Sequence, residues 1–298
     1  MKIVHVCLSC FYIDGYAYQE NILVAEHVRA GHDVQVIAST ESYDKRGHLT
    51  YMTPGTYTGT DGAVVTRLQY RYNVLPRLAR KLRAYIGLKK LLNELKPEII
   101  VFHGLCAWSL LTVTAYVRCN PGIKLFADCH EDSNNSARSW ASRELLHKRF
   151  YKPIFLRCVD QIHEVLCITV ESLNFAIDFY GSPRDKTRIY PLGCTIEAPE
   201  SVAQRRADFR ARHGFDDSDI VITQTGKLDH TKQLESSLIA FRANSSPYLK
   251  LVIAGRMSDD VRSRCLPLIQ SDSRILDLGW QTPDELRTVL AGADCPNG

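Results

Sequence analysis

The sequence predicts an α/β protein with two doubly wound parallel-sheet domains, the second of them incomplete. Apolar runs of strand length alternate with segments of helical period along the 298 residues. This alternation of strands and helices is typical of parallel sheets that are covered by helices on both faces. The length exceeds what one core usually holds, so two domains are the simplest arrangement. We expect the first domain at residues 1–195 and a partial second domain at 196–298.

Apolar runs and segments of helical period fill the first domain. The predicted strands are residues 2–8, 32–40, 64–70, 99–102, 125–128, 165–169 and 188–193, and the predicted helices are residues 19–30, 75–96, 109–119, 143–159 and 171–180. The clearest helix is 75–96, where one apolar stripe repeats with helical period: Leu78, Leu82, Tyr85, Leu92 and Leu95. Residues 41–62 have no sustained period and predict a long loop or a small excursion.

The second domain shows the same alternation after a polar stretch at residues 197–219, which we expect to connect the two domains. Strands are predicted at 221–225, 249–254 and 274–278, and helices at 233–241, 261–269 and 283–290. Because only these strands are clear, the sheet should be incomplete and should leave an uncovered edge or apolar face. Such an edge predicts poor solubility or self-association.

The stretch Val221–Lys232, VITQTGKLDHTK, organises this second domain. Its apolar run breaks at Gly226, which predicts a strand, a turn at Gly226 and a helix that carries Lys232 near its first turn. Open α/β domains build anion sites at such junctions, because backbone N–H groups and the helix dipole face the anion. Lys227 and Lys232 could converge there on one diphosphate. The alternative is that both lysines are solvated surface charges.

The composition is that of a soluble globular protein, with 45% hydrophobic and 23% charged residues. The net charge of +4 is modest and indicates neither a nucleic-acid partner nor any other particular partner. The ten cysteines lack the spacing of a disulfide framework, so we expect free thiols in a reducing cytoplasm. Cys7 and Cys10 form a single CxxC, which favours a core or loop role over a redox or metal site. The amino terminus predicts no signal peptide, and no apolar run reaches membrane-spanning length.

With this layout, the chain resembles the retaining glycosyltransferases of family 4, enzymes of the GT-B fold that use nucleotide sugars. The similar segments, in chain order, are AEHVRAGHDVQVIAS, KPEIIVFHG, RIYPLG, GKLDHTK, AFRANSSPYLKLVIAG and ILDLGWQTPDEL. Their order and spacing extend over nearly the whole chain. The resemblance implies two Rossmann-like domains, of which the first faces the acceptor and the second binds the nucleotide sugar.

The resemblance implies a set of donor-binding residues. Lys227 and Lys232 would hold the donor diphosphate beside Gly226. The family usually has Arg in place of Lys227, and a lysine keeps the charge but lacks the planar fork for bidentate phosphate contact. Gly15 falls in the family's glycine loop after the first strand, where Tyr16 replaces the usual second glycine. A single glycine can suffice for close approach of the backbone to the donor.

Acid–base chemistry would fall to a histidine of the first domain. His130, in ADCHED, matches the family's active-site histidine, and His103 matches an earlier histidine at a strand end. The alternative for each is a structural role, which is the more common one for a lone strand-end histidine. Glu131 and Asp132 are further candidates for orienting the site, with surface loop carboxylates as their alternative.

The resemblance implies sugar transfer from a nucleotide-sugar donor to a saccharide or lipid-linked acceptor, with retention and without a metal ion or cofactor. The two lysines would stabilise the leaving diphosphate. Asp217-Ser218-Asp219 has the spacing of a metal-binding Asp-x-Asp but precedes its strand, so we interpret it as a turn. The chain ends before the family's loop with two glutamates, so we expect a fragment, a natural truncation, or a site that another chain completes.

Two other functions stay open on the same fold. One is a non-catalytic or truncated nucleotide-sugar-binding protein, which the absent glutamate loop favours, and the other is a nucleotide-sugar epimerase. A hydrolase would need a Gly-x-Ser-x-Gly elbow, and a dehydrogenase would need Gly-x-Gly-x-x-Gly after its first strand; the sequence has neither. Sugar transfer to an acceptor, as against donor binding alone, separates these functions.

Positive charge is concentrated between Arg67 and Lys96. This segment has nine Lys and Arg residues and one acid, so its charge is +8 and that of the remaining chain is −4. With the apolar stripe of the 75–96 helix facing the core, Arg80, Lys81 and Lys90 should point outward. We therefore predict a cytoplasmic protein that visits the anionic inner membrane face through residues 75–96. The alternatives are a solvated basic face or a docking patch for an acidic partner.

Overall fold

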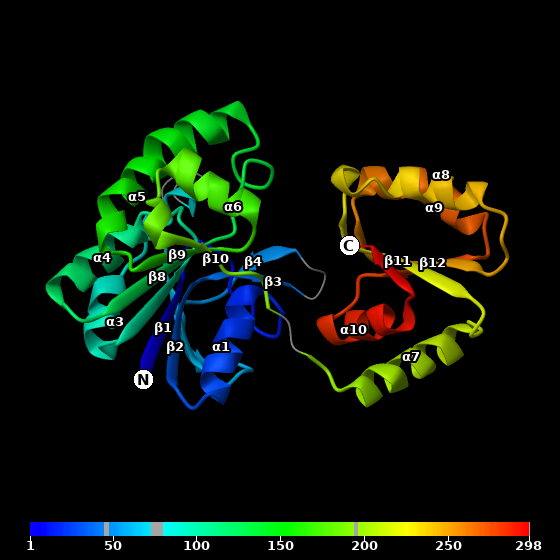
Figure 1. Cartoon of the computed structure of the whole chain (residues 1–298), viewed down its shortest axis with the longest axis horizontal. Helices are drawn as coiled ribbons and strands as arrows, with labels where there is room; N and C mark the ends of the chain where they lie inside the picture. Colours follow the sequence, from blue (N-terminus) through cyan, green and yellow to red (C-terminus); the bar gives the residue numbers. More distant parts are fainter. Residues whose placement is uncertain (45–47, 73–79, 194–195, 298) are drawn as a thin grey trace. The chain divides into compact units, whose positions relative to one another are not determined.

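The chain folds into two compact units, residues 1–194 and 195–298. The computed structural model describes residues 1–44, 48–72, 80–193 and 196–297 (Figure 1). Each unit has a mainly parallel sheet between helices, so the predicted doubly wound α/β class is confirmed. Among the residues described, no helix has the length and apolar character needed to span a bilayer.

The N-terminal unit is built on an eight-stranded sheet with the order β10-β9-β8-β7-β1-β2-β6-β5. Its strands are β1 (Lys2–Cys7), β2 (Asp33–Ser39), β5 (Gly55–Thr58), β6 (Val64–Leu68), β7 (Ile99–His103), β8 (Lys124–Cys129), β9 (Glu164–Cys167) and β10 (Thr187–Ile189). All neighbours are parallel except the edge pair β5 and β6. The central strand β1 is buried on both faces, which explains its continuous apolar run.

Helices cover both faces of this sheet (Figure 1). They are α1 (Gln19–Arg29), α3 (Leu88–Leu95), α4 (Ser109–Cys119), a π-helix (Ala141–Tyr151), α5 (Lys152–Cys158), α6 (Val170–Asn174) and a second π-helix (Phe175–Tyr180). On one face, Val24 of α1 packs in a cluster with Cys7 and Val36. On the other face, the residues of α3, α4 and α5 share one core with Val4 and Val6. Alternate residues of β1 thus supply both cores.

The excursion predicted at residues 41–62 contains a small antiparallel hairpin. Strand β3 (Glu41–Tyr43) pairs with β4 (Leu49–Tyr51), and β5 follows. Arg67 anchors the start of this excursion from β6: its Nη1 donates to the carbonyl oxygens of Tyr12 at 2.8 Å and Ser39 at 2.9 Å. This guanidinium is only 2% exposed, so Arg67 adds nothing to the surface charge that the sequence suggests for residues 67–96.

The single helix predicted at residues 75–96 is wrong. The helix α3 is confined to Leu88–Leu95, and before it Tyr85 forms a bridge with Tyr70. The backbone turns at Arg83 (φ 50°) and Gly87 (φ 82°), and the Tyr85 hydroxyl donates to the Leu8 carbonyl at 3.0 Å. Tertiary contacts of a buried tyrosine and a glycine in the left-handed region therefore override local helical period. Residues 73–79, with the predicted stripe residue Leu78, lie outside the described part.

The C-terminal unit has a four-stranded parallel sheet with the order β13-β12-β11-β14. The strands are β11 (Ile220–Leu228), β12 (Leu249–Met257), β13 (Ile275–Gly279) and β14 (Cys295–Asn297). Helices α8 (Leu234–Ala243) and α9 (Asp259–Gln270) lie on one face, and α7 (Pro199–His213) and α10 (Pro283–Gly292) on the other (Figure 1). The fourth strand corrects the prediction of three. It is held beside β11 by Asp294, whose Oδ2 accepts the Val221 N–H at 2.8 Å.

The polar stretch predicted as a connection instead forms helix α7. Two of its arginines connect it to the end of α10 by hydrogen bonds. Arg206 Nη1 donates to the Ala293 carbonyl at 2.9 Å, and Arg210 Nη1 donates to the Gly292 carbonyl at 3.2 Å. Phe209 is buried between them and touches Gly292 so closely that a Cβ there would lie 2.1 Å from the ring. The helix was missed because hydrogen-bonding arginines, rather than an apolar stripe, hold it in place.

Two glycines set the spacing of the central strands in the C-terminal unit. Gly226 of β11 and Gly255 of β12 are partners in register, and a Cβ on Gly255 would lie 2.0 Å from the Gly226 carbonyl oxygen. We expect Gly255→Ala to lower the free energy of unfolding of this unit by roughly 1–3 kcal/mol, because the strands must separate. Hydrogen exchange of β11 and β12 peptides in the full chain measures this loss.

The control is Gly55→Ala in the edge strand β5, where an added Cβ meets no atom within 4 Å. This variant should leave the exchange rates of both units near those of the unchanged protein. Equal protection of β11 and β12 in the two variants would show that the glycine pair does not limit the strand spacing.

Candidate functional site

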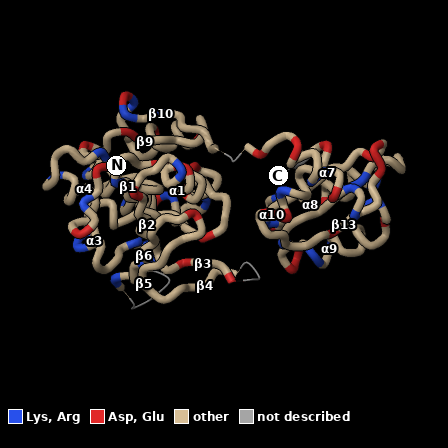
Figure 2. The backbone as a smooth tube through the Cα atoms, turned by 90° about the horizontal axis from the view of Figure 1, so that it is seen from below, with Lys and Arg blue, Asp and Glu red and all other residues tan. Residues whose placement is uncertain are grey.

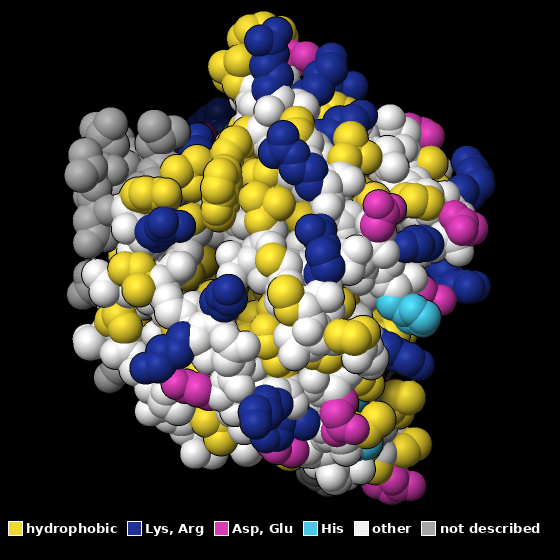
Figure 3. All heavy atoms as spheres, turned by 90° about the vertical axis from the view of Figure 1, so that its left-hand side faces the viewer, with side chains coloured by type: hydrophobic (Ala, Val, Ile, Leu, Met, Phe, Trp, Pro, Cys, Tyr) yellow, Lys and Arg dark blue, Asp and Glu magenta, His cyan; other side chains and the backbone are white. Residues whose placement is uncertain are grey.

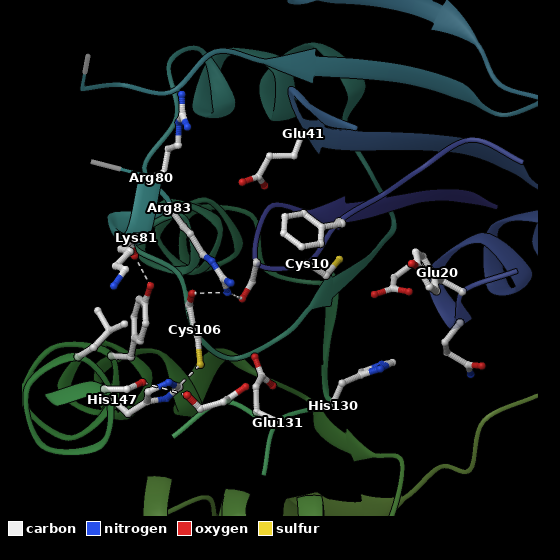
Figure 4. Close-up of a pocket in the computed structure, with 18 of the residues that line it drawn as sticks. Cys10, Glu20, Glu41, Arg80, Lys81, Arg83, Cys106, His130, Glu131 and His147 are labelled. Atoms are coloured by element: carbon white, nitrogen blue, oxygen red, sulfur yellow. Dashed lines mark hydrogen bonds between the residues drawn. The ribbon is translucent and has the colours of Figure 1, made fainter. Parts of the chain in front are cut away.

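The N-terminal unit has a cavity of ≈ 680 Å³ at the carboxyl ends of its central strands (Figure 4). Its lining includes Ser9 and Cys10 after β1, Glu20 on α1, Cys106 after β7, and His130 and Glu131 after β8. The carboxyl ends of parallel strands meet at one edge of a sheet, and ligands of open α/β folds usually bind there. Figure 4 shows His130 and Glu20 on one side of the pocket and Arg83, Cys106 and His147 on the other, with Glu131 between them.

His130 follows β8 directly and lines this cavity. Its Nε2 lies 3.5 Å from Asp128 Oδ2, within ion-pair range but without a hydrogen bond. Burial alone would lower the pKa of His130, but the Asp128 carboxylate outweighs it and raises the pKa above the ordinary value. The carboxylate therefore favours the protonated imidazole, and Nε2 has no hydrogen-bond partner among the residues that the structure describes.

Asp128 is shared between two imidazoles. It is the register partner of His103, and its Oδ2 accepts a hydrogen bond from His103 Nδ1 while its Oδ1 accepts the Gly104 N–H at 2.8 Å. Burial raises the pKa of Asp128, but the two histidines more than compensate and hold it below its usual range. Burial lowers the pKa of His103, and Asp128 overcomes this and raises it to about 10. The pair is thus an imidazolium and a carboxylate.

His103 is fully buried, and neither it nor Asp128 lines the cavity, so His103 can affect a ligand only through Asp128 and His130. Of the two candidate carboxylates, Glu131 lines the cavity, and its buried Oε2 has no hydrogen-bond partner in the described part of the chain. Asp132 does not line it. Its Oδ1 accepts the N–H groups of Asn134 at 2.6 Å and Asn135 at 2.8 Å, which closes a turn.

The lining residues that were not predicted include Arg83, Cys106 and His147. Arg83 Nη1 donates to Ser9 Oγ at 2.7 Å and to the Cys106 carbonyl at 3.0 Å. Burial, with Arg83 nearby, lowers the pKa of His147 to about 4, so this imidazole is neutral. No sequence signal marked these residues. Arg83 fell in the predicted long helix, and His147 is a lone histidine in a helical segment.

Gly15 lies in the β1–α1 loop with φ 76°, as a left-handed turn requires. It is not among the residues that line the cavity, and an added Cβ would meet no atom within 4 Å. The loop therefore has free space at Gly15, which does not itself contact the cavity in this structure.

The predicted turn at Gly226 is wrong, because β11 continues to Leu228. Gly226 has φ 108° and stays paired with Gly255, so the glycine lets the strand pass close to β12 rather than end. The chain turns later, in the single 3₁₀ turn His230–Lys232, and α8 begins only at Leu234. Lys232 thus precedes the helix instead of lying in its first turn.

Lys227, the next-to-last residue of strand β11, and Lys232, after that strand, are both exposed. Lys227 is the register partner of Arg256, which adds a second cationic side chain at this edge. Gln224 positions the other lysine, since its Nε2 donates to the Lys232 carbonyl at 2.8 Å. Gln224 was not predicted to have a role. The sequence signal that could have indicated this role is a polar residue inside an otherwise apolar strand.

Comparisons with known proteins place these features in a family. A family model described as Glycosyltransferase Family 4 matches residues 22–198. A search of the curated proteins found no match. Among solved structures, Anabaena HepE in complex with UDP and glucose is similar at 12% identity and a TM-score of 0.59, with 99% of this chain and 73% of that chain covered.

Two further structures show the range of the likeness. WaaG, a glycosyltransferase involved in lipopolysaccharide biosynthesis, has 14% identity and a TM-score of 0.62, with 99% of this chain and 74% of that chain covered. UDP-GlcNAc 2-epimerase from Neisseria meningitidis bound to UDP-GlcNAc has 13% identity and a TM-score of 0.57, with coverages of 99% and 76%. These low identities show a shared fold alone, and that fold confirms the GT-B architecture that the resemblance implied. Because the family model spans more than half of the sequence, the chain belongs to Glycosyltransferase Family 4.

Proposed function

We propose that this protein transfers a sugar from a nucleotide-sugar donor to a saccharide or lipid-linked acceptor, with retention of configuration. The observation that carries the proposal is the strand-end cavity of the N-terminal unit, where Asp128 holds His130 beside open space. A family 4 chain with a titratable group in such a cavity has the means to deprotonate an acceptor hydroxyl.

The acceptor would bind in the cavity through charged and polar side chains. Arg80, Lys81 and Glu41 line one part of it, and Glu131 lies next to His130. Mixed charges of this kind suit a ligand rich in hydroxyl groups, which both donate and accept hydrogen bonds. His130 would take the proton of the attacking hydroxyl, and Glu131 would accept a hydrogen bond from the acceptor with its unpaired oxygen.

The donor would bind at the carboxyl edge of the C-terminal sheet. Lys227 and Lys232 would bind its diphosphate, and the absence of a side chain at Gly226 would allow close approach of the backbone. HepE has been seen with UDP and glucose, which supports a nucleotide sugar as the ligand class. The lysine charges would offset the negative charge that develops on the leaving diphosphate, so we propose transfer that needs no metal ion.

An epimerase is the second candidate, because UDP-GlcNAc 2-epimerases share this fold. We favour the transferase, since the matching family model is that of glycosyltransferases. Mixing the protein with radiolabelled nucleotide sugar and acceptor separates the two. A transferase moves the label to the acceptor, whereas an epimerase leaves it on the nucleotide.

The donor site is tested by Lys232→Ala. We expect the dissociation constant for a nucleotide sugar to rise roughly 10- to 100-fold, which corresponds to the loss of a charge-assisted hydrogen bond to phosphate. Isothermal calorimetry measures the change. Arg242→Ala on α8 removes an exposed charge from the same unit and serves as the control. If both variants bind equally well, Lys232 does not contact the diphosphate.

The acid–base role is tested by His130→Ala. We expect kcat to fall roughly 100-fold or more, with little change in donor affinity, because the group acts mainly in the transition state. The neutral base is the active form and Asp128 raises the pKa of His130, so the acid limb of the kcat/KM profile should lie above about pH 6.5. His163→Ala, an exposed histidine outside the cavity, is the control. An unchanged kcat would exclude His130 as the base.

The basic surface predicted for residues 75–96 concerns where in the cell this protein would work. Basic positions lie along α3 (Figure 2), and Lys and Arg side chains alternate with hydrophobic ones over the face of the N-terminal unit that carries α3, α4 and α5 (Figure 3). Lys81 and Lys90 are exposed, as predicted, whereas Arg80 is half-buried and its Nη1 donates to the Tyr51 hydroxyl at 2.7 Å. We therefore propose that Lys81, Lys89 and Lys90, rather than one long helix, contact an anionic membrane.

Co-sedimentation with liposomes that contain anionic lipids tests this contact. We expect Lys81, Lys89 and Lys90 changed together to Glu to abolish binding at low salt, because each basic residue contributes about 1 kcal/mol near such a surface. The matched control changes three exposed arginines of the other unit to Glu: Arg212, Arg242 and Arg262. Binding that survives the lysine changes would show that this face is not the contact.

A further inference from the structure

A chain of three histidines connects Asp128 with the surface of the N-terminal unit. His103 Nε2 lies 2.9 Å from His5 Nδ1, and His5 Nε2 lies 2.9 Å from His27 Nδ1. His5 and His103 are fully buried, while His27, in the last turn of α1, is half-buried. The reaction proposed above uses none of these imidazoles directly.

A positive charge at His103 sets which nitrogen donates in each of these hydrogen bonds. An imidazolium at His103 donates from Nδ1 to Asp128, so its Nε2–H must donate to His5 Nδ1. His5 is then neutral and carries its own proton on Nε2, which donates to His27 Nδ1. Burial, with His103 and His27 nearby, lowers the pKa of His5, and burial, with His32 nearby, lowers that of His27. Each donor therefore meets an acceptor, with one positive charge at the inner end.

The same hydrogen bonds allow a second arrangement with the charge at the outer end. The Nε2 proton of His103 passes to His5 Nδ1, and the Nε2 proton of His5 passes to His27 Nδ1. His103 is left neutral and still donates from Nδ1 to Asp128, while His27 becomes the imidazolium. His103 gives up one proton, His5 gains one and gives up one, and His27 gains one, each along an existing hydrogen bond. The total charge is therefore unchanged and no ring needs to rotate.

We infer that His103, His5 and His27 share one mobile proton and act on His130 through the Asp128 carboxylate as positioning residues. With the proton on His103, two cations would compete for Asp128 once His130 took up the proton of an acceptor hydroxyl. Moving the charge two rings outward leaves His130 as the only imidazolium beside Asp128. The chain thereby strengthens His130 as a base at the moment when it accepts a proton. This inference rests on the proposed role of His130.

Other ionisable groups lie close to these three histidines or to Asp128. Cys7 lies two residues after His5 on the same face of β1, and Glu20 of α1 lies near His103. Glu131 follows β8 and lies near His130. His32 precedes β2, and its ring centre is 6.1 Å from that of His27. Glu20 and Glu131 favour positive charge at His130 and would be unchanged by the shift. His32 lies nearest the outer end, where a positive charge would oppose the outward arrangement.

The positions of the protons on His103, His5 and His27 can be measured in the unmodified protein by ¹⁵N NMR of histidine side chains, which reports the protonation of each ring nitrogen. At neutral pH we expect both nitrogens of His103 to carry protons and His5 to carry its proton on Nε2. A neutral His103 with the proton of His5 on Nδ1 would overturn the inner arrangement. This readout does not depend on any enzymatic activity.

The coupling to His130 is tested with His27→Gln. Glutamine can accept the hydrogen bond from His5 but cannot take up its proton, so the charge stays on His103. We expect the pKa of His130, followed by NMR titration of the full chain, to fall by about 0.5–1.5 units, as for a unit charge kept two rings closer at an effective dielectric of 20–80. The acid limb of the kcat/KM profile should move down by the same amount.

His163→Gln is the matched control, because it removes an exposed imidazole of the same unit whose ring packs on Phe126. It should leave the pKa of His130 within about 0.2 units. An unchanged pKa of His130 in a folded His27→Gln protein would overturn the inference. A shifted pKa with an unchanged pH profile would support the histidine chain and instead exclude His130 as the base of the reaction.

Discussion

A buried carboxylate at the end of β8 is the constraint on which the N-terminal unit depends. Asp128 cannot be ionised there without partners, since an isolated buried charge is strongly destabilising. It has the Gly104 N–H, His103 and His130 around it. These partners come from β7, from the turn after β7 and from the residue after β8. Satisfying one charge therefore fixes the strand register, the turn and the direction of the cavity imidazole together.

The C-terminal unit depends on the close approach of the backbones of β11 and β12 and not on a buried charge. Gly226 and Gly255 let two parallel strands run side by side to the carboxyl edge, where Lys227 and Arg256 bring two cationic side chains into register. Gln224 then holds the turn that carries Lys232 against the same strand. In both units the groups proposed to take up the acceptor proton or to bind the diphosphate lie at or just after the carboxyl ends of strands. This is where parallel sheets leave backbone groups and side chains open to a ligand.

Several elements were predicted wrongly because the hydrophobic period of a segment does not show the tertiary contacts that its residues make. The segment before α3 has helical period, but buried Tyr85 and the left-handed Gly87 make tertiary contacts that a straight helix could not. Helix α7 lacks a clear apolar stripe and is held instead by arginines that donate to carbonyl groups at the end of α10. The short strand β14 adds three residues to the sheet through Asp294, a contact too small to leave a period in the sequence.

The sequence by itself determined the doubly wound class and most strands and helices, because burial of β-strands and of helix faces repeats over a few residues and leaves a readable period. The family followed from the resemblance of several segments in their order along the chain. It also predicted that His130 follows a strand. Only the tertiary structure decided that His103 and Asp128 are neighbours, and that His5 and His27 continue the chain to the surface. These residues are 22 to 98 positions apart in the sequence. Their contacts depend on the register and order of the strands, which the packing of the whole unit sets.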